Sequence, residues 1–188
     1  RRKVYPYKTR MNFAKQFTKA WASGKPFVLA YTPQISGENE KARKASLQEA
    51  AEWFANLVWK AADGDRILYP IFEEYGEYCD SIGDDQTTIG KIWTGGRKFG
   101  LRGIAIFQRS ATVSKTIWGN SVVKVIGAQG YDNDIKRVCD ALGSTKEDVI
   151  DVGHSNKVLE MFLPELDEMV RTKVHYLYSE TAGSFERV

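Results

Sequence analysis

The chain has 188 residues, of which 43% are hydrophobic and 12% aromatic, and its formal net charge is +3. This length suits one domain, and the apolar content excludes a disordered chain. So small a positive charge permits contact with nucleic acid but does not argue for it. Apolar runs stay below the roughly 20 residues that a membrane-spanning helix needs, and no signal peptide is expected.

The first predicted element is a helix that follows Thr9. Apolar residues recur at helical spacing over residues 11–21, and Gly24 predicts the end of the helix. The run "KPFVLAYTP" predicts a buried strand over residues 27–31. A polar loop is predicted over residues 34–44.

A long amphipathic helix is predicted next, over residues 46–62. Ser46 and Glu49 have the spacing of a capping box, which predicts that the helix begins there. A strand over residues 66–72 follows. Residues 88–100 predict a short helix that ends in a basic turn.

The second half continues to alternate strands and helices. The predicted segments are a strand, a short helix or turn, a strand and a helix, over residues 103–110, 112–120, 121–128 and 132–143. Ser144 and Glu147 form a second capping box, which predicts another short helix after Gly143. The tail segments 157–163 and 172–179 have the alternation of strands, and a helix stays open for the first. This order predicts an α/β fold with a mostly parallel sheet.

Lys8 and Thr9 stand where this chain enters its first helix. They fit the last two positions of the P-loop pattern G-x-x-x-x-G-K-[ST], but Arg2 and Tyr7 occupy its glycine positions. A P-loop binds phosphate through backbone N–H groups and a helix N-terminus, and glycines let the backbone come close. A basic strand that simply enters a helix is therefore the alternative for this stretch.

Polar side chains end two of the predicted strands. Glu73 and Glu74 follow "ILYPIF", and Gln108 ends "GIAIFQ". Ligands of open α/β sheets bind at the carboxyl ends of the strands, where one carboxylate can support Mg²⁺ and the next can orient an attacking water. An acidic loop and a strand-capping amide are the alternatives, and Pro70 disfavours a central position for the first strand.

The turn "GGRKFGLRG" carries Arg97, Lys98 and Arg102. Arginine suits the stabilisation of phosphoryl charge, in its own subunit or from a neighbour, and a solvated basic turn is the alternative. Cys79 and Cys139 lack metal-ligand spacing and are expected to be reduced thiols of a cytoplasmic protein. The two histidines are far apart in the sequence and are expected to be structural.

The order of these signals is more specific than any one of them. Lys-Thr and a helix precede "RILYPIFEE", and "GGRKFGLRGIAIFQRS" follows. This order resembles the FtsK–HerA group of P-loop ATPases over residues 5–143, although Glu73 stands where that group usually has Asp. The short chain resembles most the viral genome-packaging ATPases and the zonula-occludens-toxin-like phage assembly ATPases.

The resemblance implies a RecA-like P-loop NTPase core with a mostly parallel central sheet flanked by helices. It implies a single ATPase domain over residues 1–188, with a core over residues 4–143 and a C-terminal extension over residues 144–188. The implied cofactors are ATP and Mg²⁺. The implied function is that of an ATP-driven DNA translocase that packages a phage or virus genome.

The resemblance also implies roles for individual residues. Lys8 would contact phosphate, and Thr9 would hold Mg²⁺ with support from Glu73. Glu74 would position the attacking water, and Gln108 would sense the γ-phosphate.

The implied partners are DNA and further copies of the chain in a ring of five or six subunits. Arg97 would act across a subunit boundary, while Lys98, Arg102 and Lys115 would contact DNA. A viral capsid vertex or membrane proteins are further implied partners, in the cytoplasm or the virion. Two alternatives stay open: an inactive interaction subunit on the same fold, and a small α/β nucleic-acid-binding module whose DNA binding is salt-sensitive and indifferent to ATP.

Overall fold

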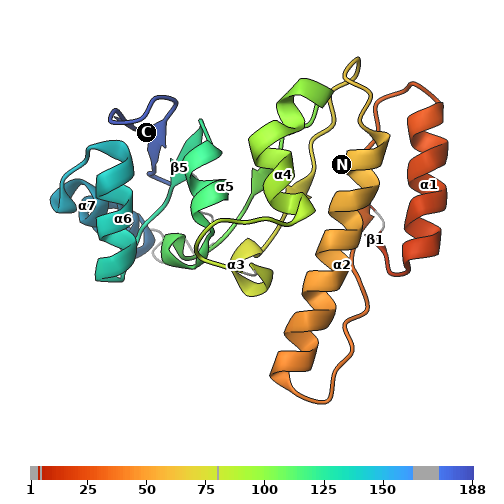
Figure 1. Cartoon of the computed structure of the whole chain (residues 1–188). Coiled ribbons are helices and arrows are strands. Elements are labelled where there is room, and N and C mark those ends of the chain that lie inside the picture. Colours follow the sequence, from red (N-terminus) through yellow and green to blue (C-terminus); the bar gives the residue numbers. More distant parts are fainter. Residues whose placement is uncertain (1–3, 5, 80, 163–173) are drawn as a thin grey trace. The chain divides into compact units, whose positions relative to one another are not determined.

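The computed structural model describes residues 4, 6–79, 81–162 and 174–188 (Figure 1). The chain divides into two compact units, each drawn from two stretches of sequence. Unit 1 comprises Arg1–Phe72 and Gln86–Ile104, and unit 2 comprises Glu73–Asp85 and Ala105–Val188. The assignment of the chain to a single ATPase domain stays a prediction.

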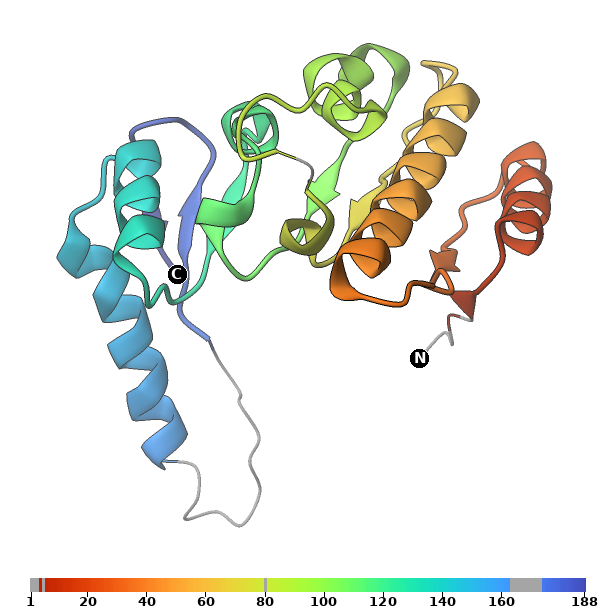
Figure 2. The same ribbon diagram turned by 60° about the horizontal axis from the view of Figure 1, so that its bottom comes forward.

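Helices make up most of unit 1. They are α1 (Arg10–Ala22), α2 (Glu40–Ala61), α4 (Thr88–Gly95) and the 3-10 turn η1 (Gly96–Phe99). The strands are β1 (Pro6–Tyr7), β2 (Ala30–Tyr31), β3 (Ile71–Phe72) and, at the boundary of the two units, β4 (Ile104–Ala105). Helix α2 lies between α1 and α4 (Figures 1 and 2). Strands β1 and β2 pair in parallel, and β3 pairs with β4.

Aromatic rings form the core between α1, α2 and β2. The Phe13 ring is 2% exposed and lies 5.3 Å from the ring of Tyr31, 5.8 Å from that of Phe54 and 6.1 Å from that of Phe17. Phe13 and Phe17 are one helical turn apart, so both face the same side of α1. The predicted helical spacing of this segment is therefore confirmed.

The N-terminus of α2 differs from the prediction. The helix begins at Glu40 because the Asn39 side chain caps it, accepting a hydrogen bond from the backbone N–H of Ala42 at 2.9 Å. The capping box at Ser46 is wrong, and residues 40–44 are helical and not a loop. This first turn is charged and exposed, so it lacks the apolar rhythm that reveals a helix, and asparagine is as strong an N-cap as serine.

Unit 2 combines helices of different lengths with an antiparallel sheet. Its helical elements are α3 (Tyr75–Tyr78), η2 (Ser110–Thr112), α5 (Lys115–Asn120), α6 (Asp132–Leu142) and α7 (Lys146–Phe162). Its strands are β5 (Lys124–Ile126), β6 (Leu177–Ser179) and β7 (Glu186–Arg187), paired antiparallel in that order. The core between them is aliphatic and includes Val138, Leu142, Val149, Val152 and Leu177.

The helix after Gly143 is longer than predicted. Helix α7 has 17 residues, so residues 157–162 are helical and the strand alternative for them is wrong, while residue 163 lies outside the described residues. The reciprocal bonds at its start join Thr145 and Asp148, at 2.8 and 3.2 Å. The capping box therefore lies one position later than the predicted pair of Ser144 and Glu147. An aspartate can take the acidic position of such a box as well as a glutamate.

The α/β class is confirmed, but a continuous central sheet is not found among the described residues. The strands there have two or three residues and form separate small sheets, one of them antiparallel. The predicted apolar runs over residues 27–31, 66–72, 103–110 and 121–128 each contribute only part of their length. An apolar run indicates that a strand is buried. It does not determine how many of its residues pair with a neighbouring strand.

Candidate functional site

Glu73 and Glu74 directly follow β3, as predicted. Glu74 has φ 50° and ψ 41°, in the left-handed region. Among the described residues it is the only one other than glycine with a positive φ. Such a conformation costs about 1–3 kcal/mol and persists only where neighbouring contacts fix it. Here the Tyr75 N–H donates to the Ile106 carbonyl at 2.9 Å, and the Tyr78 hydroxyl donates to the Glu73 carbonyl at 3.0 Å.

The Gln108 side chain contacts the Glu74 carboxylate. Its Nε2 lies 3.1 Å from Oε1 and 3.2 Å from Oε2 of Glu74, although the two residues are 34 positions apart. Both are exposed. The bond between Tyr75 and Ile106 joins the two segments next to this pair, which explains how the side chains meet. Two of the residues predicted to act in catalysis are therefore neighbours within unit 2.

This pair can orient a water molecule. One edge of the Glu74 carboxylate accepts from an amide, and an ionised carboxylate has further lone pairs with which to accept from water. The Tyr78 phenol, which donates to the Glu73 carbonyl, stays neutral because burial, and after it the charges of Glu73 and Glu74, raise its pKa. The described residues contain no group of three His, Cys, Asp or Glu side chains that could hold a metal ion, so Glu73 does not belong to such a cluster.

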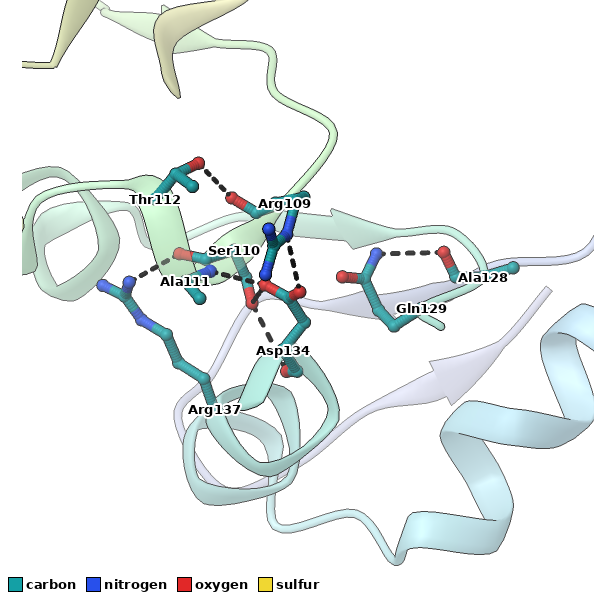
Figure 3. Close-up of polar contacts among 8 residues, drawn as sticks. All are labelled: Arg109, Ser110, Ala111, Thr112, Ala128, Gln129, Asp134 and Arg137. Carbon is teal, nitrogen blue, oxygen red and sulfur yellow. Dashed lines mark hydrogen bonds and ion pairs between the residues drawn. The ribbon is translucent and has the colours of Figure 1, made fainter. Parts of the chain in front are cut away.

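The segment after Gln108 is tied to α6 through Asp134, whose side chain is 1% exposed (Figure 3). The Asp134 carboxylate accepts from Arg109 Nε at 3.2 Å, from Ser110 Oγ at 3.2 Å and from the Ala111 N–H at 2.6 Å. We call these four residues the Asp134 anchor. The anchor fixes the backbone of the three residues that follow Gln108, and so the direction in which the chain leaves Gln108.

Arg137, one turn further along α6, supports the same segment. Its Nη1 donates to the carbonyl of Ser110 at 2.5 Å (Figure 3) and to that of Val113 at 2.8 Å. Sequence reasoning missed both Asp134 and Arg137. A signal for Asp134 was available: it shares the helical face of Val138 and Leu142, four and eight positions on, where a charged residue needs buried partners.

Unit 1 carries the predicted phosphate-binding residues. Lys8 is exposed, and Thr9 is the N-cap of α1, with its Oγ1 accepting from the Asn12 N–H at 3.3 Å. Tyr7, at the second glycine position of the P-loop pattern, lies in β1 and pairs with Tyr31. Arg2, at the first, lies outside the described residues.

These residues fit a phosphate group only in part. Pro6 and Tyr7 belong to a paired strand, and proline has no N–H, so they do not form a loop of N–H groups around an anion. The Lys8 ammonium and the first turn of α1 are the groups that could still attract phosphate.

The basic turn of unit 1 projects its side chains into solvent. Arg97 and Lys98 lie exposed on η1, and Gly100 ends this turn at φ 81°. The backbone of the turn is held by bonds from the Gly64 N–H to Phe99 O at 3.1 Å and from the Leu68 N–H to Gly100 O at 3.0 Å. Arg102, shortly after it, and Lys115, the first residue of α5 in unit 2, are also exposed.

No helix among the described residues is both long and apolar enough to cross a membrane.

No protein-family model and no curated protein matches the chain. Solved structures of the genome packaging NTPase B204 from Sulfolobus turreted icosahedral virus 2 do match. The complex with AMPPCP is 11% identical, with a TM-score of 0.48, and the match covers 97% of this chain and 71% of that one. For the complexes with ATP-gammaS and AMP the identities are 13% and 10%, the TM-scores 0.48 and 0.49, and the coverages 97% and 73% in both cases. The chain is thus similar to this packaging NTPase along nearly its whole length, at values that assign neither a family nor a function.

Proposed function

We propose that the chain is an ATP hydrolase in which Glu74 orients the attacking water and Gln108 responds to the terminal phosphate. The observation that supports this is the contact of the Gln108 amide with the Glu74 carboxylate, which brings together two polar strand ends distant in sequence. The resemblance of the motif order to packaging ATPases extends the proposal to an ATP-driven DNA translocase.

The chain's own residues have the following roles in this proposal. Glu74, ionised and held by Gln108, accepts a hydrogen bond from water and directs its lone pair. The Gln108 amide has a second N–H, which would donate to a phosphate oxygen while the first stays on Glu74. When bound, ATP with Mg²⁺ supplies the phosphoryl group and charge neutralisation, with Lys8, Thr9 and Glu73 as the residues that would hold them.

The test is ATP turnover by the full chain, with and without DNA. Glu74→Gln should lower kcat by about 10²- to 10⁴-fold, because the water loses its base, while nucleotide still binds. Glu77→Gln, an exposed glutamate on α3, is the matched control and should keep normal turnover. Lys8→Ala should weaken nucleotide binding itself, whereas Lys15→Ala, exposed on α1, should not. A wild-type chain that never hydrolyses ATP would refute this function.

A second candidate function is a non-hydrolysing interaction subunit. The pairing of Tyr7 with Tyr31 favours it, since a strand occupies the place of the phosphate loop. Such a protein would show no shift in melting temperature with ATP and Mg²⁺, and Lys8→Ala would change nothing.

DNA contact by Lys98, Arg102 and Lys115 is part of the same proposal. Their exposure suits contact with phosphates, unlike Arg109, which is tied to Asp134. Binding should be independent of DNA sequence and should weaken steeply with salt. Replacing these three residues by alanine should make the plot of log K against log salt concentration less steep. The magnitude of its negative slope should fall by about 3, one for each lost phosphate contact. Lys41→Ala, exposed on α2, should leave the slope unchanged.

Arg97 is proposed to act on the nucleotide of a neighbouring subunit in a ring of five or six. Arg97→Ala should abolish most turnover and leave nucleotide affinity and the fold intact, because the side chain is exposed. Mixing Arg97→Ala subunits with Glu74→Gln subunits should restore part of the activity. Normal hydrolysis by Arg97→Ala would leave Arg97 as a surface residue only.

A further inference from the structure

We infer that Asp134 is a positioning residue of the Glu74–Gln108 pair. Its buried carboxylate fixes the backbone of Arg109, Ser110 and Ala111, and so holds the Gln108 amide against Glu74. The catalytic meaning of this inference rests on the proposed function, whereas the positioning itself is a property of unit 2 alone.

The buried carboxylate of Asp134 accepts hydrogen bonds from the segment that follows Gln108. A buried carboxylate is retained only when several donors meet it, because an unsatisfied charged group is costly. Arg109 Nε, Ser110 Oγ and the Ala111 N–H supply these donors from three consecutive residues (Figure 3). Three successive residues that point at one anion leave this stretch of backbone little freedom to rotate.

The Glu74–Gln108 pair needs support from the backbone on both sides of Gln108. Glu74 and Gln108 both face solvent, where an amide–carboxylate bond competes with water and adds little net stability. The geometry of such a pair must come from the backbone on either side. The bond from Tyr75 N–H to Ile106 O fixes the side before Gln108. The Asp134 anchor fixes the side after it.

Helix α6 holds the Asp134 anchor in place. Asp134 lies in the first turn of α6, and Arg137 on the next turn donates to the carbonyls of Ser110 and Val113. The Asp134 carboxylate therefore accepts from N–H and hydroxyl donors of the segment after Gln108. The Arg137 guanidinium donates to carbonyls of the same segment. Helix α6 is itself fixed by the aliphatic core through Val138 and Leu142, both 0% exposed.

The decisive variant is Asp134→Asn in the full chain. It keeps the size of the side chain and one oxygen acceptor, but it removes the charge and turns an N–H₂ group toward the Arg109 guanidinium. Asp140→Asn, on the exposed side of the same helix, is the matched control. The two readouts are the NMR resonance of the Gln108 side-chain amide, assigned by its loss in Gln108→Ala, and steady-state ATP turnover.

In the wild-type chain the Gln108 amide resonance should move when Glu74 is replaced by alanine. Asp134→Asn should move it toward the same position and lower kcat by about 10- to 100-fold, the effect of a small misplacement, with KM within about twofold. Asp140→Asn should change neither. An unaltered Gln108 resonance together with normal kcat in a folded Asp134→Asn chain would overturn the inference.

The two proposals fail in different ways. If the wild-type chain does not hydrolyse ATP, the proposed function falls, and the Gln108 resonance alone still judges the role of Asp134. If Asp134→Asn does not fold, Ser110→Ala keeps the charge and removes one of the three donors. It should shift the Gln108 resonance in the same direction by less and lower kcat by about threefold, the value of one hydrogen bond. No shift in Ser110→Ala would then overturn the inference.

Discussion

Units 1 and 2 are packed by different means. Between α1, α2 and β2 the core of unit 1 is a cluster of aromatic rings around Phe13, whereas the core between the helices and the sheet of unit 2 is aliphatic. Four buried polar residues, Ser110, Ser114, Asp134 and Ser179, lie in unit 2 beside that aliphatic core. Ring packing stabilises unit 1 through buried contact area and preferred ring geometries, whereas hydrogen bonds to the buried Asp134 carboxylate fix the segment after Gln108 in unit 2. The segment held in this way begins directly after Gln108, one member of the Glu74–Gln108 pair.

The largest effect should come from the aromatic core. Phe13→Ala should lower the free energy of unfolding by about 3–5 kcal/mol, because it leaves a cavity among several rings. Met11→Ala, on the same helix but 80% exposed, should change it by less than about 0.5 kcal/mol. Urea unfolding followed by tryptophan fluorescence reports mainly on unit 1, which holds every tryptophan except Trp118. Equal costs for the two variants would show that the ring cluster does not carry the stability of unit 1.

The basic turn of unit 1 should be the next most sensitive place. Gly100 has φ 81°, and a Cβ there would lie 2.2 Å from the carbonyl oxygen of Arg66. Gly24 has φ 66° with nothing within 4 Å, so it isolates the cost of the positive φ. Gly24→Ala should cost about 1–2 kcal/mol and Gly100→Ala about 3 kcal/mol, as measured by urea unfolding. Equal costs would mean that the backbone contact at Arg66 yields easily.

The elements were predictable wherever the sequence has a strong period or a special residue. Helix α1 and the end of α6 at Gly143 followed from apolar spacing and from a glycine suited to φ 67°. Helix starts were less predictable, because Asn39 and Thr145 compete with nearby residues of similar capping strength. Sheet extent was predicted poorly, since strand pairing depends on partners far away in the chain.

The exposed residues of the candidate site were predictable from the sequence, but the buried residue that positions them was not. Glu74 and Gln108 were visible as polar residues at strand ends, and they meet in the structure. Asp134 was not identified, although its place on an apolar helical face gave a clue, because its partners lie more than 20 positions away. The absence of a phosphate loop at Tyr7 was foreshadowed by the missing glycines.

Unit 1 contains a carboxylate contact of its own, between α2 and the start of α4. Glu52 on α2 accepts from the Thr88 N–H at 3.0 Å and from its hydroxyl, at the N-terminus of α4. Glu52→Ala should cost about 1–2 kcal/mol, the value of a lost helix cap. Glu49→Ala removes only an exposed ion pair with Arg10 and should cost less than about 1 kcal/mol. A cost for Glu52→Ala as large as for Phe13→Ala would mean that unit 1 also depends on a polar anchor.

The smallest effect should be a loss of unit 2 stability at high pH. Burial is the main cause that raises the pKa of Tyr75, and burial also raises that of Tyr78, with the charges of Glu73 and Glu74 adding to it. Because the folded state keeps both phenols neutral, their contribution is fully present below the unfolded pKa of about 10 and declines as pH rises above it. By pH about 10.5 the loss should be roughly 1 kcal/mol for each tyrosine. Urea unfolding of Tyr75→Phe, followed by circular dichroism from pH 8 to 10.5, should show about half of the wild-type pH dependence. Tyr69→Phe, at an exposed position in unit 1, should leave that dependence unchanged. A wild-type chain whose stability is flat over this range would show that water reaches both phenols and that their burial does not restrain ionisation.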